Sequence, residues 1–303
     1  MNRRPGVTAV SGATRWIMSV GVTLCLIASI ASCSAHTPRP VSDKTPILFV
    51  HGRGMHSSSF KTMIQYFRKI GYPDYCLRTI DLVPNDGPNI AAAEEQLAPE
   101  IERYVTEVNR IRKSRAEDAP AVTKIDIIAH SMGSVSSRWY AAKVRPDRVR
   151  VWISLAGPNH GSNVGCPGAA GSGKVELCPA YARTYEASPL QYMLNGGPNG
   201  DVDETPYGIG PDQQSRKRII PTGDRRILYL TVRTEPDEWI DPVESTILDG
   251  TGGMSVSLPV GFPAVETTPG NFKMTNRVSH DGMLADEDVL RLLALLLLEA
   301  DKQ

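Results

Sequence analysis

The sequence predicts one α/β domain, a three-layer sandwich in which helices cover both faces of a mostly parallel β-sheet. Three observations support this fold class. Short apolar runs without polar alternation recur along the chain, as expected for parallel strands that are buried on both faces. Segments with the apolar spacing of amphipathic helices separate these runs, and this alternation is typical of crossovers between parallel strands. The length of 303 residues is sufficient for one large domain with a rigid core.

The individual elements follow from the spacing of apolar residues. The predicted strands are residues 46–50, 75–81, 122–129, 149–155, 227–232 and 272–278. The predicted helices are residues 58–70, 90–113, 132–144 and 283–300. Gly71 is expected to end the first helix. Pro99 is expected to kink the second helix, because proline has no N–H for the helical hydrogen bond.

One segment interrupts the alternation of strands and helices. Residues 157–224 are rich in Gly and Pro and contain only short helical pieces, such as residues 188–195. Unpatterned insertions of this length inside a domain are typically functional, as lids or binding loops. We therefore expect a lid-like insertion at about 157–224 within a single domain that comprises residues 45–303.

The charge balance excludes one class of partner. Lys and Arg together number 33 and Asp and Glu together number 33, so the formal net charge is zero. Proteins that bind nucleic acids normally carry a basic face or stripe. No nucleic-acid partner is therefore expected.

Residues 1–33 have the pattern of a signal peptide. Three arginines precede or adjoin an uncharged apolar run over residues 16–31, which is short for a membrane span. The run ends in Ile-Ala-Ser-Cys, which resembles a bacterial lipobox and predicts export with a lipid anchor on Cys33 at the cell envelope. Cleavage near Ala35 to release a secreted protein is the alternative. Residues 34–44, rich in Pro, Ser and charge, are expected to form a tether.

Export has a consequence for the remaining cysteines. Cys166 and Cys178 bracket a Gly-rich loop, and in an oxidising compartment they are expected to form a disulfide. Cys76 lies in a segment with strand-like pattern and is expected to be a buried apolar filler.

Ser131 is the candidate nucleophile. It lies in IIAHSMGS, between an apolar strand and a helix, with Ala129 and Gly133 two positions away on either side. The tight turn of a nucleophile elbow requires small residues at these two positions and exposes the serine hydroxyl at the carboxyl edge of the sheet. The alternative role is that of a helix N-cap, which serine also favours.

Two backbone N–H groups are expected to stabilise an oxyanion beside Ser131. In this arrangement one donor belongs to the residue after the nucleophile and the other to a loop after an earlier strand. Met132 and Arg53, which follows His51-Gly52, occupy these positions. His51 is expected to fix its loop by hydrogen bonding.

The base and the acid are expected to follow the serine in the chain. His280 lies between the last predicted strand and the final helix, where a base belongs, whereas His160 comes too early to leave room for an acid strand. Four carboxylates follow the strand that ends near residue 232. Asp237 is favoured by its distance from that strand end and Asp241 is the next choice; the full set is Glu235, Asp237, Glu238 and Asp241.

With these residues identified, the chain resembles the class 2 lipases, small bacterial α/β-hydrolases whose elbow is Ala-His-Ser-Met-Gly. The similar segments are PILFVHGRG, KIDIIAHSMGS, ILYLTVRTEPDEWIDP and RVSHDGML, which are spread from residue 46 to about 284. The resemblance places the acid on Asp237 and the base on His280. It implies no metal and no cofactor.

The resemblance implies a carboxylic ester hydrolase, an esterase or triacylglycerol lipase that works through an acyl-enzyme. Ser131, His280 and Asp237 would form its triad, and the N–H groups of Arg53 and Met132 its oxyanion hole. The expected partners are an ester or lipid substrate and, through the anchor, a membrane; we expect a monomer. The alternatives are a polyhydroxyalkanoate-type polyester depolymerase, an acyltransferase, and a non-catalytic envelope lipoprotein that binds apolar ligands.

Overall fold

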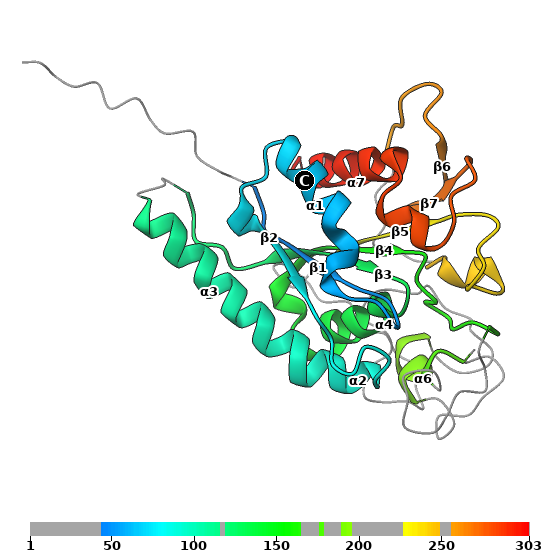
Figure 1. Cartoon of the computed structure of the whole chain (residues 1–303), viewed down its shortest axis with the longest axis horizontal. Helices are drawn as coiled ribbons and strands as arrows, with labels where there is room; N and C mark the ends of the chain where they lie inside the picture. Colours follow the sequence, from blue (N-terminus) through cyan, green and yellow to red (C-terminus); the bar gives the residue numbers. More distant parts are fainter. Residues whose placement is uncertain are drawn as a thin grey trace, which may run out of the picture. The chain divides into compact units, whose positions relative to one another are not determined.

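The computed structural model describes residues 44–115, 119–164, 176–178, 189–195, 227–248 and 256–302 (Figure 1). All of these residues belong to the unit Arg39–Gln303. The predicted signal peptide, its Cys33, and the tether up to residue 43 lie outside the described residues, as does Cys166. Within the described part of the chain, no helix combines the length and the apolar character needed to cross a membrane.

A seven-stranded sheet forms the centre of the domain, with the strand order β2-β1-β3-β4-β5-β7-β6. Every pair of neighbours is parallel except β6 and β7, which pair antiparallel at one edge. The strands are β1 (Ile47–Val50), β2 (Leu77–Ile80), β3 (Ile125–His130), β4 (Val149–Leu155), β5 (Leu228–Arg233), β6 (Ala264–Thr268) and β7 (Asn271–Met274). The predicted mostly parallel sheet is confirmed, and β6 was not predicted.

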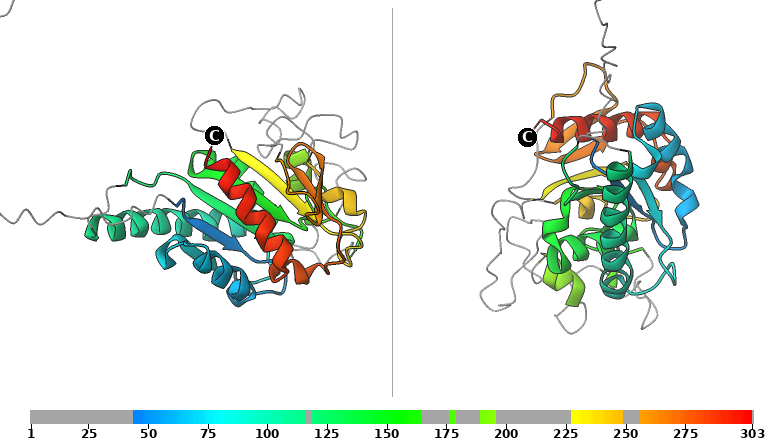
Figure 2. Two further views of the ribbon diagram at one scale, coloured as in Figure 1. Left: turned by 90° about the horizontal axis from the view of Figure 1, so that it is seen from above. Right: turned by 90° about the vertical axis from the view of Figure 1, so that its left-hand side faces the viewer.

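Helices cover both faces of the sheet, which makes three layers (Figure 2). They are α1 (Lys61–Lys69), α2 (Asn89–Ala91), α3 (Ala98–Ser114), α4 (Met132–Trp139), α6 (Pro189–Asn195) and α7 (Glu287–Ala300), with π-helical turns at Ala92–Leu97 and Tyr140–Val144. Alternate residues of each strand point to opposite faces. Phe49 of β1 therefore joins the core beneath α1 and α7, whereas its neighbour Val50 joins the core beneath α3.

The predicted helix over residues 90–113 is confirmed, but it is not α-helical throughout. It consists of α2, a π-helical turn at Ala92–Leu97, and α3. Pro99 lies in the first turn of α3. Its missing N–H leaves the carbonyl of Glu95 without the regular helical donor, so the irregular turn falls just before the proline.

Cys76 is fully buried in the apolar core on the α1 and α7 side of the sheet, with its Sγ 3.7 Å from the carbonyl oxygen of Lys44. Its predicted role as a buried filler is confirmed. Of the insertion predicted at about 157–224, the structure describes residues 157–164, 176–178 and 189–195. Its function as a lid and the Cys166–Cys178 disulfide stay predictions.

Candidate active site

Ser131 occupies a strained turn between β3 and α4. Its φ of 52° and ψ of −128° place a non-glycine residue outside the regions that L-residues favour. Its N–H donates to the carbonyl oxygen of Leu155, the last residue of β4, at 2.9 Å. This is the backbone geometry that a nucleophile elbow requires, and it was predicted from the small residues on either side.

The elbow has no room for larger neighbours. A Cβ on Gly133 would lie 2.4 Å from the carbonyl oxygen of His51 and 2.6 Å from that of Val50, both of which are backbone atoms that cannot turn away. A Cβ on Gly52 would lie 2.8 Å from the Cβ of Ser131. The two glycines therefore let the loop after β1 approach the serine closely.

Ser131 and His280 line one cavity of about 200 Å³. Much of its wall is apolar, and Trp239 at its edge is half exposed. The lining residues are Arg53, Met55, Ser131, Pro158, Ser162, Val164, Leu177, Trp239, Ile240, His280 and Asp281.

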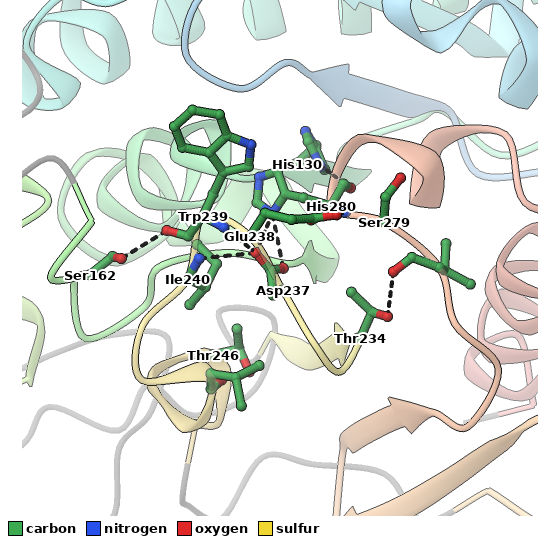
Figure 3. Close-up of polar contacts among 12 residues, drawn as sticks. His130, Ser162, Thr234, Asp237, Glu238, Trp239, Ile240, Thr246, Ser279 and His280 are labelled. Carbon is green, nitrogen blue, oxygen red and sulfur yellow. Dashed lines mark hydrogen bonds and ion pairs between the residues drawn. The ribbon is translucent and has the colours of Figure 1, made fainter.

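His280 is held by Asp237, which follows the end of β5. The Nδ1 atom of His280 lies 2.9 Å from Oδ2 and 3.0 Å from Oδ1 of Asp237 (Figure 3). Both side chains are buried, since that of Asp237 is 0% and that of His280 is 4% exposed. Asp237 Oδ1 also accepts the N–H groups of Trp239 at 2.8 Å and Ile240 at 2.9 Å, which fix the carboxylate in its loop.

The other three acid candidates have different partners. Glu238 Oε2 accepts the backbone N–H of His280 at 2.9 Å, so it holds the backbone of that residue rather than its ring. Asp241 Oδ2 accepts a hydrogen bond from the side-chain amide of Asn163. Glu235 pairs with Lys273. Of the four candidates, Asp237 is the one that contacts the imidazole.

No role in the site was predicted for His130, yet it contacts His280 in the structure. The two rings are 4.7 Å apart between centroids, and Nε2 of His130 lies 3.0 Å from the carbonyl oxygen of His280. A carbonyl can only accept, so Nε2 carries the proton. Burial, and to a smaller extent the neighbouring His280, lower the pKa of His130 to about 3. His130 is therefore a neutral donor that ties the His280 loop to the elbow.

This buried neutral histidine makes the stability depend on pH. Because the folded pKa of about 3 lies below the ordinary value of 6.5, the unfolded chain binds more protons between these two values. The contribution of His130 to the free energy of unfolding is therefore fully present above pH 6.5 and is lost as the pH drops toward 3. His130→Gln should remove up to about 1.4 kcal/mol per pH unit of this slope. Denaturant unfolding of both proteins from pH 4 to 7 measures it.

The difference between the two slopes isolates His130. Burial also lowers the pKa of His51, but this residue is present in both proteins and cancels in the comparison. Equal slopes for the parent and His130→Gln would show that His130 takes up its proton at an ordinary pH.

The two expected oxyanion donors are available. Within the described part of the chain, the backbone N–H groups of Arg53 and Met132 donate to no protein acceptor. His51 fixes the first loop as predicted, because its Nε2 accepts the N–H of Leu82 at 2.9 Å and its Nδ1 lies 2.8 Å from the carbonyl oxygen of Gly52. Met132 begins α4, whose N-terminus favours a negative charge.

A buried polar network supports the wall of the cavity after β4. Arg138 of α4 donates to the carbonyl oxygen of Asn159 at 3.1 Å and to the side-chain oxygen of Asn195 in α6 at 2.8 Å. Asn159 in turn donates to the carbonyl oxygen of Thr246 at 2.7 Å. His160 lies against Ser245, with Nδ1 2.9 Å from its carbonyl oxygen, and so serves this wall rather than Ser131.

One group of side chains has the composition of a metal site. Nitrogen or oxygen atoms of His130, His280 and Asp281 lie within 4.8 Å of one another. Each histidine uses one ring nitrogen within the protein, since His130 Nε2 bonds to the His280 carbonyl and His280 Nδ1 bonds to Asp237. These bonds place both histidines in one hydrogen-bonded network with Asp237.

Comparisons with known proteins find similarity to lipases. Residues 44–181 match the family model described as Lipase (class 2). The structure of Aspergillus fumigatus lipase B is similar with a TM-score of 0.53 and 13% identity, over 82% of this chain and 51% of that chain. The mature form of Bacillus licheniformis lipase BlEst2 gives a TM-score of 0.36 and 22% identity, over 64% of this chain and 69% of that chain.

A curated protein also matches part of the sequence. The ABC multidrug transporter MDR5 of Trichophyton rubrum is 29% identical over 160 residues, which are 52% of this chain and 12% of that protein. The chain thus spans a small part of this relative and about half of the fungal lipase. The comparisons confirm the α/β-hydrolase fold and the predicted resemblance to the class 2 lipases.

Proposed function

We propose that the chain is a serine hydrolase of carboxylic esters, a lipase or esterase, because residues 44–181 match the family model of the class 2 lipases. The observation that carries the proposal is the composition of one cavity. Ser131 lines it at a strained elbow, and His280, bonded to the buried Asp237, lines it too. This is the constellation that acyl transfer through a serine requires.

The geometry supports a two-step reaction. His280 uses Nδ1 for Asp237, which leaves Nε2 to take the proton of Ser131 as its Oγ attacks the ester carbonyl. The N–H groups of Arg53 and Met132 stabilise the oxyanion, and protonated His280 returns the proton to the leaving alcohol. Water then attacks the acyl-enzyme, with His280 again as base, and releases the acid.

An activity series tests this function. The purified protein should hydrolyse p-nitrophenyl esters, and a comparison of soluble esters of increasing chain length with emulsified triglycerides locates its optimum. Faster turnover of emulsions than of soluble esters would indicate interfacial activation by the insertion at 157–224. Clearing of polyester films without clearing of triglyceride emulsions would favour a depolymerase. No hydrolysis of any ester would contradict the proposal.

We also propose that the protein is exported and anchored by a lipid on Cys33. The support is the sequence alone: an apolar run followed by small residues and a cysteine, which lie outside the described residues. Mass spectrometry of the mature N-terminal peptide should find an acylated Cys33, and Cys33→Ser should release the protein from the membrane fraction. An unmodified peptide that begins at His36 would contradict the anchor.

A further inference from the structure

The cavity beside Ser131 contains one positive charge within an apolar lining. Six of its lining residues are apolar: Met55, Pro158, Val164, Leu177, Trp239 and Ile240. The charged side chains that line it are Arg53, on the loop after β1, and Asp281, next to His280. An ester bound here therefore meets apolar walls, a guanidinium on one side and a carboxylate beside the base.

Among the described residues, the guanidinium of Arg53 has no partner. It forms no hydrogen bond and no ion pair with any of them, although Arg53 is partly buried. Other buried or partly buried arginines of the chain do have such partners: Arg138 donates to Asn195, and Arg150 to Asp126. Partial burial of a charge without compensation costs free energy. The vacant donors of Arg53 fit a bidentate oxyanion, either a carboxylate or a phosphate.

The position of Arg53 relates this charge to the reaction. Its backbone N–H is the proposed oxyanion donor, so its side chain starts beside the scissile carbonyl. A substrate group that bonds to the guanidinium must lie a few bonds from the ester. Asp281, on the side of the base, repels an anion there and favours its placement at Arg53.

We propose that the cavity selects esters that carry a second, ionised acid group near the scissile carbonyl, and that Arg53 binds this group. The inference rests on the proposed ester hydrolysis and names its substrate class: amphiphilic esters with an apolar body and one anionic end.

Matched pairs of esters test the preference in the wild-type protein. One pair is the mono-p-nitrophenyl ester of adipic acid and its neutral counterpart, p-nitrophenyl hexanoate. The other pair is hexanoyl lysophosphatidate and monohexanoylglycerol. A kcat/KM about tenfold or more higher for the anionic member is expected in at least one pair, because a charged hydrogen bond contributes this much. The pair that shows it distinguishes a carboxylate from a phosphate.

Variants assign the preference to Arg53. Since its N–H is part of the proposed oxyanion hole, the ratio of anionic to neutral kcat/KM within each variant is the quantity to compare. Arg53→Gln should bring the ratio to about one, and Arg53→Lys should retain part of the preference. Asp281→Asn should raise the ratio because it removes a repulsion. Lys61→Gln removes an exposed cation outside the cavity and should leave the ratio unchanged.

The possible failures are distinguishable. If neither the neutral nor the anionic esters are hydrolysed, the proposed function itself is wrong. If the neutral esters are hydrolysed and both pairs give a ratio near one, the function stands and the role of Arg53 is wrong. A preference that survives in Arg53→Gln would also overturn the assignment.

Discussion

Replacement of Ser131 by alanine should lower kcat for ester hydrolysis by about 10⁶ and leave the fold intact. The hydroxyl is the atom that forms the acyl-enzyme, and the residual rate would come from binding and the oxyanion donors alone. Alanine at this position should remove no packing contact of the core, because the Ser131 side chain lines the cavity. Single-turnover and steady-state assays with p-nitrophenyl esters measure the loss, and thermal unfolding checks the fold.

Ser134→Ala is the matched control for this experiment. Ser134 lies in the first turn of α4, is fully buried, and donates to the carbonyl oxygen of Ala129 at 3.1 Å. It does not line the cavity. Ser134→Ala removes a hydroxyl three residues from Ser131 and should leave kcat within about tenfold of the parental value. Parental activity in Ser131→Ala would end the proposed mechanism.

Asp237→Asn should lower kcat by about 10⁴, the scale seen when the acid of a serine hydrolase triad becomes an amide. The amide cannot stabilise an imidazolium, and its NH₂ group holds the His280 ring in the wrong tautomer. The asparagine oxygen can still accept the N–H groups of Trp239 and Ile240, so the loop should keep its shape. The pH profile of kcat/KM separates this electrostatic loss from a structural one.

Two neighbouring carboxylates provide the comparison for Asp237. Asp241→Asn removes the charge that bonds to the Asn163 amide and should cost little activity. Glu238→Gln keeps an oxygen that can accept the His280 N–H, and its loss of kcat should lie between those of Asp241→Asn and Asp237→Asn. A larger loss of activity in Asp241→Asn than in Asp237→Asn would show that Asp237 is not the acid of the triad.

The sheet and the elbow could be predicted because they depend on local patterns. Apolar runs such as residues 47–50 are buried at every position, as the absence of alternation indicated. The small residues around Ser131 permit the strained backbone of that turn and the close approach of the loop after β1. Strand β6 was missed since its residues, Ala-Val-Glu-Thr-Thr, are largely exposed at a sheet edge and carry no apolar run.

The finer features of the site depend on contacts between distant residues. Asp237 and Asp241 are only four positions apart, and the distance from the strand end favoured Asp237 without excluding Asp241. The folded loop shows that Asp237 contacts His280, 43 residues away. The bond between His130 and His280 joins residues 150 positions apart, and nothing in the local pattern indicates it.

Covalent labelling tests the central claim, that Ser131 is an activated nucleophile, most directly. A fluorophosphonate probe should modify the folded wild-type protein once, and peptide mass spectrometry should place the adduct on Ser131. Ser131→Ala should take up no probe, and His280→Ala should react far more slowly because the base is absent. A wild-type protein that stays unmodified, or carries the adduct on another residue, would contradict the account.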